Sequence, residues 1–142
     1  MEPRLSLITL GVADLERSCR FYRDGLGLPT TRSPDDGIVF FQTAGVVLAI
    51  YPYGALADDV GPGWDRPRSP FAGFTIAHNV RLRHEVDDVL ELAASAGAQI
   101  VKAAEDTFWG GYSGYFADPD GYLWEVAWGA FEFREDGSLI VP

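Results

Sequence analysis

Apolar and polar positions alternate along the first half of the chain in a pattern that predicts a strand, a helix and three more strands. Residues 5–12 alternate with the period of a half-buried strand. A helix then begins after Asp14, a residue type that caps helix N-termini, and glycines at 25 and 27 end it. The remaining strands of this half are expected at residues 28–32, 38–42 and 46–52.

The second half repeats this order. A strand is expected at residues 74–80, a helix at 83–96 and three strands at 99–102, 114–117 and 122–128. The repeat indicates an internal duplication of one βαβββ module, within a single domain of the α+β class. We place module one at about residues 4–53, a Pro- and Gly-rich linker at 54–71, module two at 72–129, and a C-terminal tail, read as a short hairpin, at 130–142.

Composition excludes several classes of protein for this chain. The chain has 142 residues, 47% of them hydrophobic, and a formal net charge of −10. A sequence pI of about 4.4 argues against nucleic acid as a partner, and no apolar run is long enough to cross a membrane. The single cysteine, Cys19, allows neither an internal disulfide nor a thiolate zinc site, and no secretory leader precedes the first strand, so a cytoplasmic location is expected.

The charge is uneven, because residues 1–71 carry seven basic and nine acidic side chains, and residues 72–142 carry four and twelve. Four of these twelve acids, Glu85, Asp87, Asp88 and Glu91, fall on the expected helix, where we expect them to be solvated. We therefore interpret the acidic composition mainly as a source of solubility. The alternative interpretation is attraction of a cationic ligand or a metal.

Two motifs carry a family resemblance. The segment 12–18, followed by Phe21-Tyr22 and by residues 26–28, resembles the opening of a vicinal oxygen chelate protein. The segment 115–125, with its Asp118-Pro119-Asp120-Gly121 turn leading to Glu125, resembles the closing signature of that superfamily. Its members include glyoxalase I, bleomycin-resistance proteins and extradiol dioxygenases. The resemblance implies two βαβββ modules that form a half-barrel cleft, and it makes a homodimer the expected assembly.

The resemblance also implies where a metal would bind. Metal-dependent members place one ligand on the first and one on the last strand of each module, and these positions are occupied here by Leu7, Ala49, Thr75 and Glu125. Only Glu125 is a strong ligand, so we predict no metal and no other cofactor, unless a divalent ion binds atypically through Glu125. Strand alternation turns His78 toward the helix layer, and His84 is expected to be solvated.

Strand alternation assigns the polar residues of the expected cleft. Thr9, Tyr51, Thr75 and Asn79 join Glu125 among small apolar residues, a composition that suits a mainly apolar ligand oriented by a few hydrogen bonds. The loop 106–114 adds Phe108, Trp109 and Tyr112 among glycines, and Trp109 and Tyr112 are the predicted ligand contacts. Either the loop aromatics stack on a planar ligand and close over the cleft, or Phe108 and Trp109 plug the open side of the half-barrel or a dimer seam.

Three functional hypotheses follow. The first is metal-independent binding of a small, partly aromatic organic ligand, in the manner of the bleomycin-resistance branch. The second is a lyase or isomerase that acts on a small carbonyl or thiol conjugate, with Glu125 as catalytic base or metal ligand. The third is an interaction module with a vestigial cleft.

Overall fold

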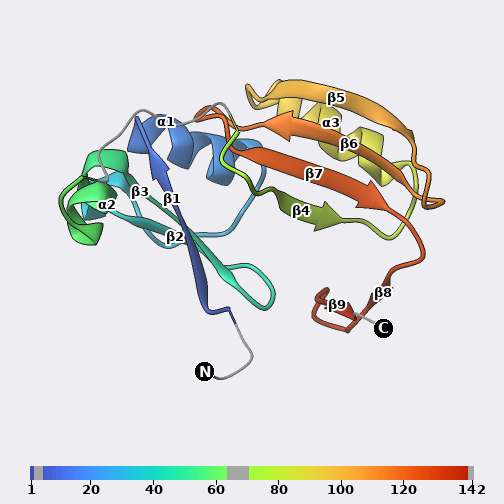
Figure 1. Cartoon of the computed structure of the whole chain (residues 1–142), viewed down its shortest axis with the longest axis horizontal. Helices are drawn as coiled ribbons and strands as arrows, with labels where there is room; N and C mark the ends of the chain where they lie inside the picture. The colour runs from blue at the N-terminus through green and yellow to red at the C-terminus, as the bar shows by residue number, and fades with distance from the viewer. Residues whose placement is uncertain (2–4, 64–70, 141–142) are drawn as a thin grey trace. The chain divides into compact units, whose positions relative to one another are not determined.

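The chain folds into mixed sheets with few helices, an α+β architecture, in two compact units (Figure 1). The structure is a computed structural model and describes residues 1, 5–63 and 71–140. Unit 1 spans Met1–Ser69 and unit 2 spans Pro70–Pro142. None of the helices in the described residues is both long and apolar enough to cross a membrane.

Unit 1 contains a three-stranded sheet in the order β1-β3-β2. Strand β1 (Leu7–Val12) runs parallel to β3 (Val47–Pro52), and β2 (Val39–Phe41) pairs with β3 antiparallel. Helix α1 (Leu15–Arg20) begins as predicted, because the Asp14 side chain accepts the Arg17 backbone N–H at 2.9 Å. A π-helical turn (Phe21–Gly25) continues it, and a 3₁₀ turn (Pro34–Asp36) precedes β2.

The strand predicted at residues 28–32 is wrong. This segment has no strand hydrogen-bonding pattern, and one backbone bond, from Gln42 N–H to the Pro29 carbonyl at 3.0 Å, ties it to the end of β2. Pro29 has no N–H to donate, and Gly27 before it adopts a positive φ of 74°, so the chain turns where a ladder would have to continue.

A helix also occupies part of the predicted linker. Helix α2 (Tyr53–Val60) begins directly after β3, whereas residues 64–70 of the linker lie outside the described residues. It packs on the sheet beside Gly11, where an added Cβ would meet the Tyr53 ring at 3.0 Å and Leu56 at 3.3 Å. Proline and glycine around this segment suggested a linker, but the run from 55 to 57 of alanine and leucine favours a helix.

Unit 2 has the predicted order βαβββ. Strand β4 (Ile76–Asn79) precedes helix α3 (Glu85–Ser95), and β5 (Gln99–Asp106), β6 (Tyr112–Ala117) and β7 (Leu123–Trp128) follow. The sheet order is β4-β7-β6-β5, with β4 parallel to β7 and the other pairs antiparallel. Helix α3 covers one face of this sheet against β5, β6 and β7 (Figure 1). The core between them contains Val86, Leu90, Phe116 and Val126.

The turn between β6 and β7 forms as its residues predict. Asp118 is 4% exposed, and its carboxylate accepts the backbone N–H groups of Asp120 and Tyr122 at 2.9 and 2.8 Å. Gly121 supplies the positive φ, 84°, that closes the turn. The predicted C-terminal hairpin is also confirmed, since β8 (Glu132–Phe133) pairs antiparallel with β9 (Leu139–Ile140).

Candidate functional site

Glu125 lies near the middle of the unit 2 sheet, on the face opposite α3. In the ladder it lies between Ala77 of β4 and Tyr115 of β6, and it is half-buried. Tyr115 and Glu125 are cross-strand neighbours on this face. Burial raises the pKa of Tyr115, and the neighbouring negative charge of Glu125 adds to this effect. The phenol therefore stays protonated beside the carboxylate.

Two other predicted residues share this face. Asn79 is half-buried on β4, two positions beyond Ala77, and Thr75 is exposed immediately before that strand. Both are diagonal to Glu125 across the β4–β7 pair, which places them on the same side of the sheet. The face that we call the Glu125 face thus contains one acid, its tyrosine neighbour and two small polar groups.

Trp109 lies on a continuation of the Glu125 face. An added Cβ on Gly111 would come within 1.8 Å of its indole, and one on Gly129 within 2.7 Å, so the ring occupies the space that these two glycines leave open. The Phe131 ring lies 6.0 Å from it, centroid to centroid. Since Gly129 is four residues beyond Glu125, the indole stands roughly 13 Å along the strand from the carboxylate.

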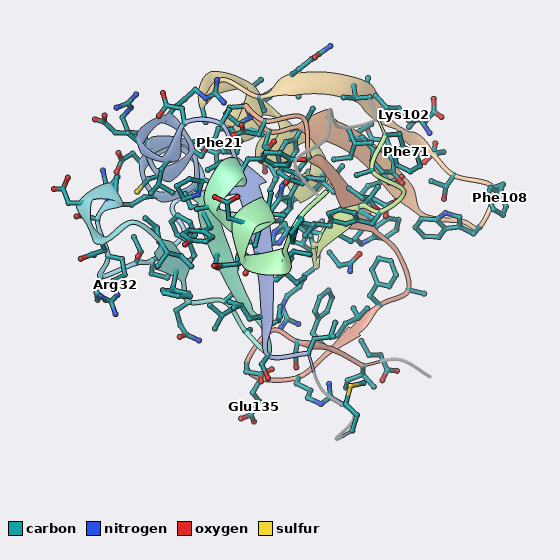
Figure 2. All side chains as sticks on the ribbon, turned by 60° about the vertical axis from the view of Figure 1, so that its left-hand side comes forward. Phe21, Arg32, Phe71, Lys102, Phe108 and Glu135 are labelled. Carbon is teal, nitrogen blue, oxygen red and sulfur yellow. The ribbon has the colours of Figure 1, made fainter. Side chains whose placement is uncertain are left out.

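Phe108, unlike Trp109, does not contact the sheet. Its side chain is fully exposed, at the tip of the loop between β5 and β6 (Figure 2). Three hydrogen bonds between Thr107 and residues 110–111 hold this loop closed, one of them from the Gly111 N–H to the Thr107 hydroxyl at 2.9 Å. The loop therefore presents Trp109 to the sheet and Phe108 to solvent.

Tyr112 is not part of this site. It lies on the α3 side of the sheet, where its hydroxyl donates to the Asp87 carboxylate at 3.1 Å and the Arg83 guanidinium stacks 3.7 Å from its ring centroid. Arg83 also forms an ion pair with Asp106 at 2.5 Å. Odd and even positions of a strand point to opposite faces, so Tyr112 cannot join Tyr115 on the same side. Tyr112 therefore links the start of β6 to α3, on the face away from Glu125.

Thr9 and Tyr51 belong to unit 1. They share one face of the β1–β3 pair, with Thr9 opposite Ala49 and Tyr51 opposite Gly11, and both are half-buried. Helix α2 packs beside the Tyr51 end of this face, over Gly11. A pocket of about 410 Å³ opens on unit 1, between the segment Pro29–Arg32 and the side chains of Phe40, Gln42 and Val47. Phe40 pairs with Ala49, so the pocket wall continues the Thr9 face.

The donor set does not fit the metal that the resemblance implies. Leu7 and Ala49 of unit 1 and Thr75 of unit 2 have no imidazole or carboxylate, and the neighbours of Glu125 in the ladder are Ala77 and Tyr115. Among residues 5–63 and 71–140, no three His, Cys, Asp or Glu side chains lie close enough together to hold an ion. A single carboxylate is too few ligands for a divalent ion in this geometry.

His78 faces the α3 side, as predicted. It pairs with Val126, a core residue beneath α3, and its ring keeps an exposed edge although protein atoms surround the rest. Burial lowers the pKa of His78, and the negative charge of Glu85 opposes this shift. His84 is exposed, and its Nε2 lies 3.8 Å from Asp88.

Tyr115 was missing from the residues predicted for the site. The signal was present in the sequence, because the closed turn at 118–121 fixes the antiparallel register so that Tyr115 stands opposite Glu125. Reading the hairpin outward from its turn would have found the partner of the acid. The position of the Trp109 ring over Gly111 and Gly129 has no such signal in the sequence, because it depends on how the loop closes.

Comparisons with known proteins agree with this architecture. The family model of the Glyoxalase/Bleomycin resistance protein/Dioxygenase superfamily matches residues 4–126. No curated protein matches the chain significantly. A glyoxalase-related enzyme from Fulvimarina pelagi has a similar structure, with a TM-score of 0.86 and 37% identity, over 98% of each chain.

More distant solved structures share the fold. A glyoxalase/bleomycin resistance protein/dioxygenase from Nocardioides is 25% identical over 90% of this chain and 84% of its own, with a TM-score of 0.74. A lactoylglutathione lyase from Agrobacterium tumefaciens is 22% identical over 91% of this chain and 96% of its own, with a TM-score of 0.67. At the identity of the latter, the likeness concerns the fold alone.

Proposed function

The chain belongs to the Glyoxalase/Bleomycin resistance protein/Dioxygenase superfamily, and we propose that within it this protein binds a small, partly aromatic organic ligand on the Glu125 face without a resident metal. The observation that carries the proposal is the pairing of Glu125 with Tyr115 across the β6–β7 ladder, where both side chains are half-buried on the same face. At the one position of the expected ligand set that has a carboxylate, the cross-strand neighbour is a phenol and not a second metal ligand.

The surroundings of this pair favour a ligand with an aromatic body and a cationic group. The Tyr115 ring beside Glu125 offers an aromatic surface, whereas the indole of Trp109, roughly 13 Å along the strand, lies beyond the reach of a small ligand held at the carboxylate. Glu125 offers a negative charge. A half-buried carboxylate favours a cation more strongly than a fully solvated one does, because the local dielectric constant is lower than that of water.

A pair of probes with the same ring and opposite charges tests the proposal. Isothermal titration of the full chain, kept in chelator, compares 1-naphthylmethylammonium with 1-naphthoate. We expect the cation to bind at least tenfold more tightly, and Glu125→Gln to remove this preference. Tyr115→Phe should weaken the cation three- to tenfold, since a carboxylate without the phenol beside it must be ordered on binding.

Matched controls lie on the same sheet. Tyr112→Phe removes a phenol from the same strand on the other face, and Glu105→Gln removes an exposed acid of β5 that pairs with Lys102. Both should bind the cation as wild type does. Equal affinity for the two probes, or an equal loss from Tyr112→Phe and Tyr115→Phe, would overturn the proposal.

A second candidate function is isomerisation of a thiol conjugate. Two observations favour it: the similar structure at 37% identity is described as a glyoxalase-related enzyme, and a carboxylate with a protonated phenol beside it is a base next to a proton donor. Glu125 would remove a proton from the carbon next to a carbonyl, and the proton would return to the neighbouring carbon.

The assay for this candidate follows conversion of the glutathione hemithioacetal of methylglyoxal into S-lactoylglutathione, a thioester with its own absorbance. The enzyme hypothesis expects turnover that Glu125→Gln abolishes and Tyr112→Phe leaves unchanged. The binding hypothesis expects no turnover above the buffer rate, so the two functions are separated by one experiment.

A further inference from the structure

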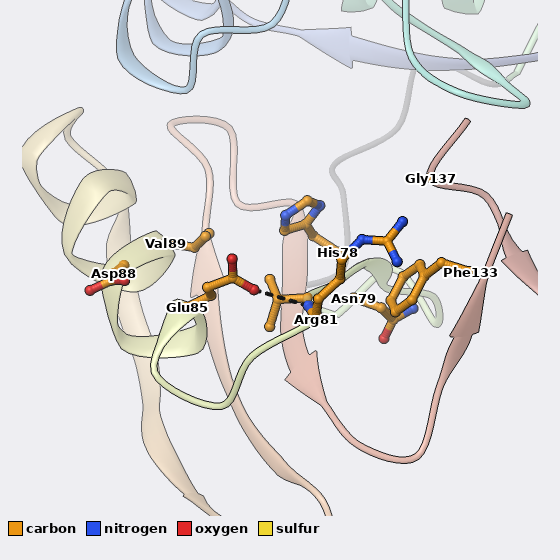
Figure 3. A pocket seen from close by; sticks show the side chains of 9 residues that line it. His78, Asn79, Arg81, Glu85, Asp88, Val89, Phe133 and Gly137 are labelled. Atoms are coloured by element: carbon orange, nitrogen blue, oxygen red, sulfur yellow. Dashed lines mark hydrogen bonds between the residues drawn. The ribbon is translucent and has the colours of Figure 1, made fainter. Parts of the chain in front are cut away.

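A second pocket lies within unit 2, at the end of β4 and on the α3 side of the sheet. Its volume is about 380 Å³, and the end of β4, the first turns of α3 and the C-terminal hairpin line it (Figure 3). Sites for small ligands range from about 300 to 1,000 Å³, so this pocket matches a molecule of amino-acid size. Neither Glu125 nor Tyr115 is among its lining residues, although Asn79, which belongs to the Glu125 face, is one of them.

Positive charge lies on one side of this pocket. The Arg81 guanidinium stands 4.5 Å over the Phe133 ring of the hairpin, and its Nη2 reaches the Arg134 carbonyl at 3.4 Å. No carboxylate among the described residues forms an ion pair with Arg81. Stacking on the ring and the backbone contact orient the guanidinium and leave most of its N–H donors free, which is the arrangement that binds a carboxylate with two parallel hydrogen bonds.

Negative charge lies on the other side. Glu85 projects from the first turn of α3 toward Arg81 and Phe133, whereas the carboxylate of Asp88, a second lining residue, points away from them (Figure 3). Glu85 also accepts the backbone N–H groups of Arg81 and Leu82, at 3.0 and 2.8 Å, which fixes its position. Asp88 has only the exposed His84, 3.8 Å away, as a partner.

The space between the two charged sides is less polar. Val80 and Val89 line it, together with the half-exposed imidazole of His78. Burial lowers the pKa of His78, so the ring is neutral near pH 7 and adds a hydrogen-bonding group without a further charge. The pocket thus combines a cation without an ion-pair partner among the described residues, the Glu85 carboxylate across from it and apolar lining residues.

We propose that this pocket is a binding site for a zwitterionic α-amino acid with an apolar side chain. The ligand carboxylate pairs with Arg81, the ammonium group faces Glu85, and the side chain lies against Val89 and Phe133. A simple anion would meet the Glu85 carboxylate, and a simple cation would meet Arg81. Only a molecule with both charges satisfies both sides.

Isothermal titration of the full chain with L-phenylalanine and L-leucine tests the site. Two analogues each remove one charge of the ligand: L-phenylalaninamide lacks the carboxylate and 3-phenylpropionate lacks the ammonium group. We expect one amino acid per chain, with each analogue at least tenfold weaker than L-phenylalanine. Absence of binding by both amino acids at 20 mM, or equal affinities of L-phenylalanine and its two analogues, would overturn the proposal.

Variants locate the site. Arg81→Gln should weaken L-phenylalanine at least tenfold and leave L-phenylalaninamide unchanged, so the difference between acid and amide disappears, and Arg81→Lys should restore part of it. Arg20→Gln, an exposed arginine of unit 1 paired with Glu16, is the matched control and should bind as wild type does. If Glu125→Gln abolishes binding and Arg81→Gln does not, the amino acid binds on the Glu125 face, and the proposal fails.

Discussion

The Asp118 turn gives the sharpest stability prediction, because the same turn sets the register that brings Tyr115 to Glu125. In Asp118→Ala, the backbone N–H groups of Asp120 and Tyr122 lose the acceptor that they now reach at 2.9 and 2.8 Å. A buried donor left unpaired costs about 1–3 kcal/mol, so the buried Tyr122 N–H and the part-buried Asp120 N–H together cost at most roughly 2–6 kcal/mol. This is a large part of the roughly 5–15 kcal/mol that keeps a typical domain folded.

Urea denaturation followed by tryptophan fluorescence measures the effect. Asp118→Asn keeps an acceptor oxygen at the same place and should lose about 1 kcal/mol, the usual net value of one hydrogen bond. Asp136→Ala is the matched control, since Asp136 makes similar bonds to Ser138, at 2.9 and 2.7 Å, in an exposed hairpin tip where water replaces them. We expect Asp136→Ala to cost under about 0.5 kcal/mol, as exposed substitutions usually do.

The reasoning is refuted if Asp118→Ala and Asp136→Ala lower the denaturation midpoint equally. It is also refuted if Asp118→Asn is as harmful as Asp118→Ala, because the acceptor oxygen would then not be what stabilises the turn. If a folded Asp118→Ala protein still prefers the aromatic cation to the aromatic anion, the register that places Tyr115 opposite Glu125 does not depend on the Asp118 side chain.

Three further predictions concern packing and charge. Gly111→Ala should displace the Trp109 indole, 1.8 Å from the new Cβ, seen as a red-shifted emission and a loss of about 1–3 kcal/mol, while Gly54→Ala, with no atom within 4 Å, should be neutral or stabilising. Because burial lowers the pKa of His78 in the folded protein, the unfolded chain takes up its proton first, and stability should fall as the pH drops below the usual pKa of 6.5. His78→Gln should reduce the difference in stability that urea titrations measure between pH 7.5 and 5.5. An unchanged difference would contradict this prediction. Arg83→Ala should lower the free energy of unfolding by about 1 kcal/mol, because it removes the stack on Tyr112 and the ion pair with Asp106. Arg83→Lys should recover only the part due to the ion pair. Arg20→Ala, at a simple surface ion pair, should lower the free energy of unfolding by under about 0.5 kcal/mol.

Local chemistry explains which parts of the fold could be predicted. Asp14 and the 118–121 turn act through their own neighbours, so their side chains and spacing were sufficient to place a helix start and a hairpin. Strand alternation likewise placed His78 on the α3 side and Glu125 on the other.

The errors arise where tertiary contacts or backbone details decide. Helix α2 is short and lies among prolines and glycines, and its packing beside Gly11 is a tertiary contact that no local pattern reveals. Tyr112 and Trp109 were grouped because they are close in sequence, yet the first is on a strand facing α3 and the second is in a loop folded back over two glycines. Proximity in sequence does not give the face of a sheet.

The central claim is that Glu125 and Tyr115 anchor a ligand without a metal. The most direct measurement is the affinity of the full chain for 1-naphthylmethylammonium after exhaustive chelation, and again after addition of excess Zn²⁺. We predict that the two dissociation constants agree within twofold, because the donor set around Glu125 does not hold the ion. Binding that appears only after Zn²⁺ is added, and that Glu125→Gln abolishes, would contradict the account.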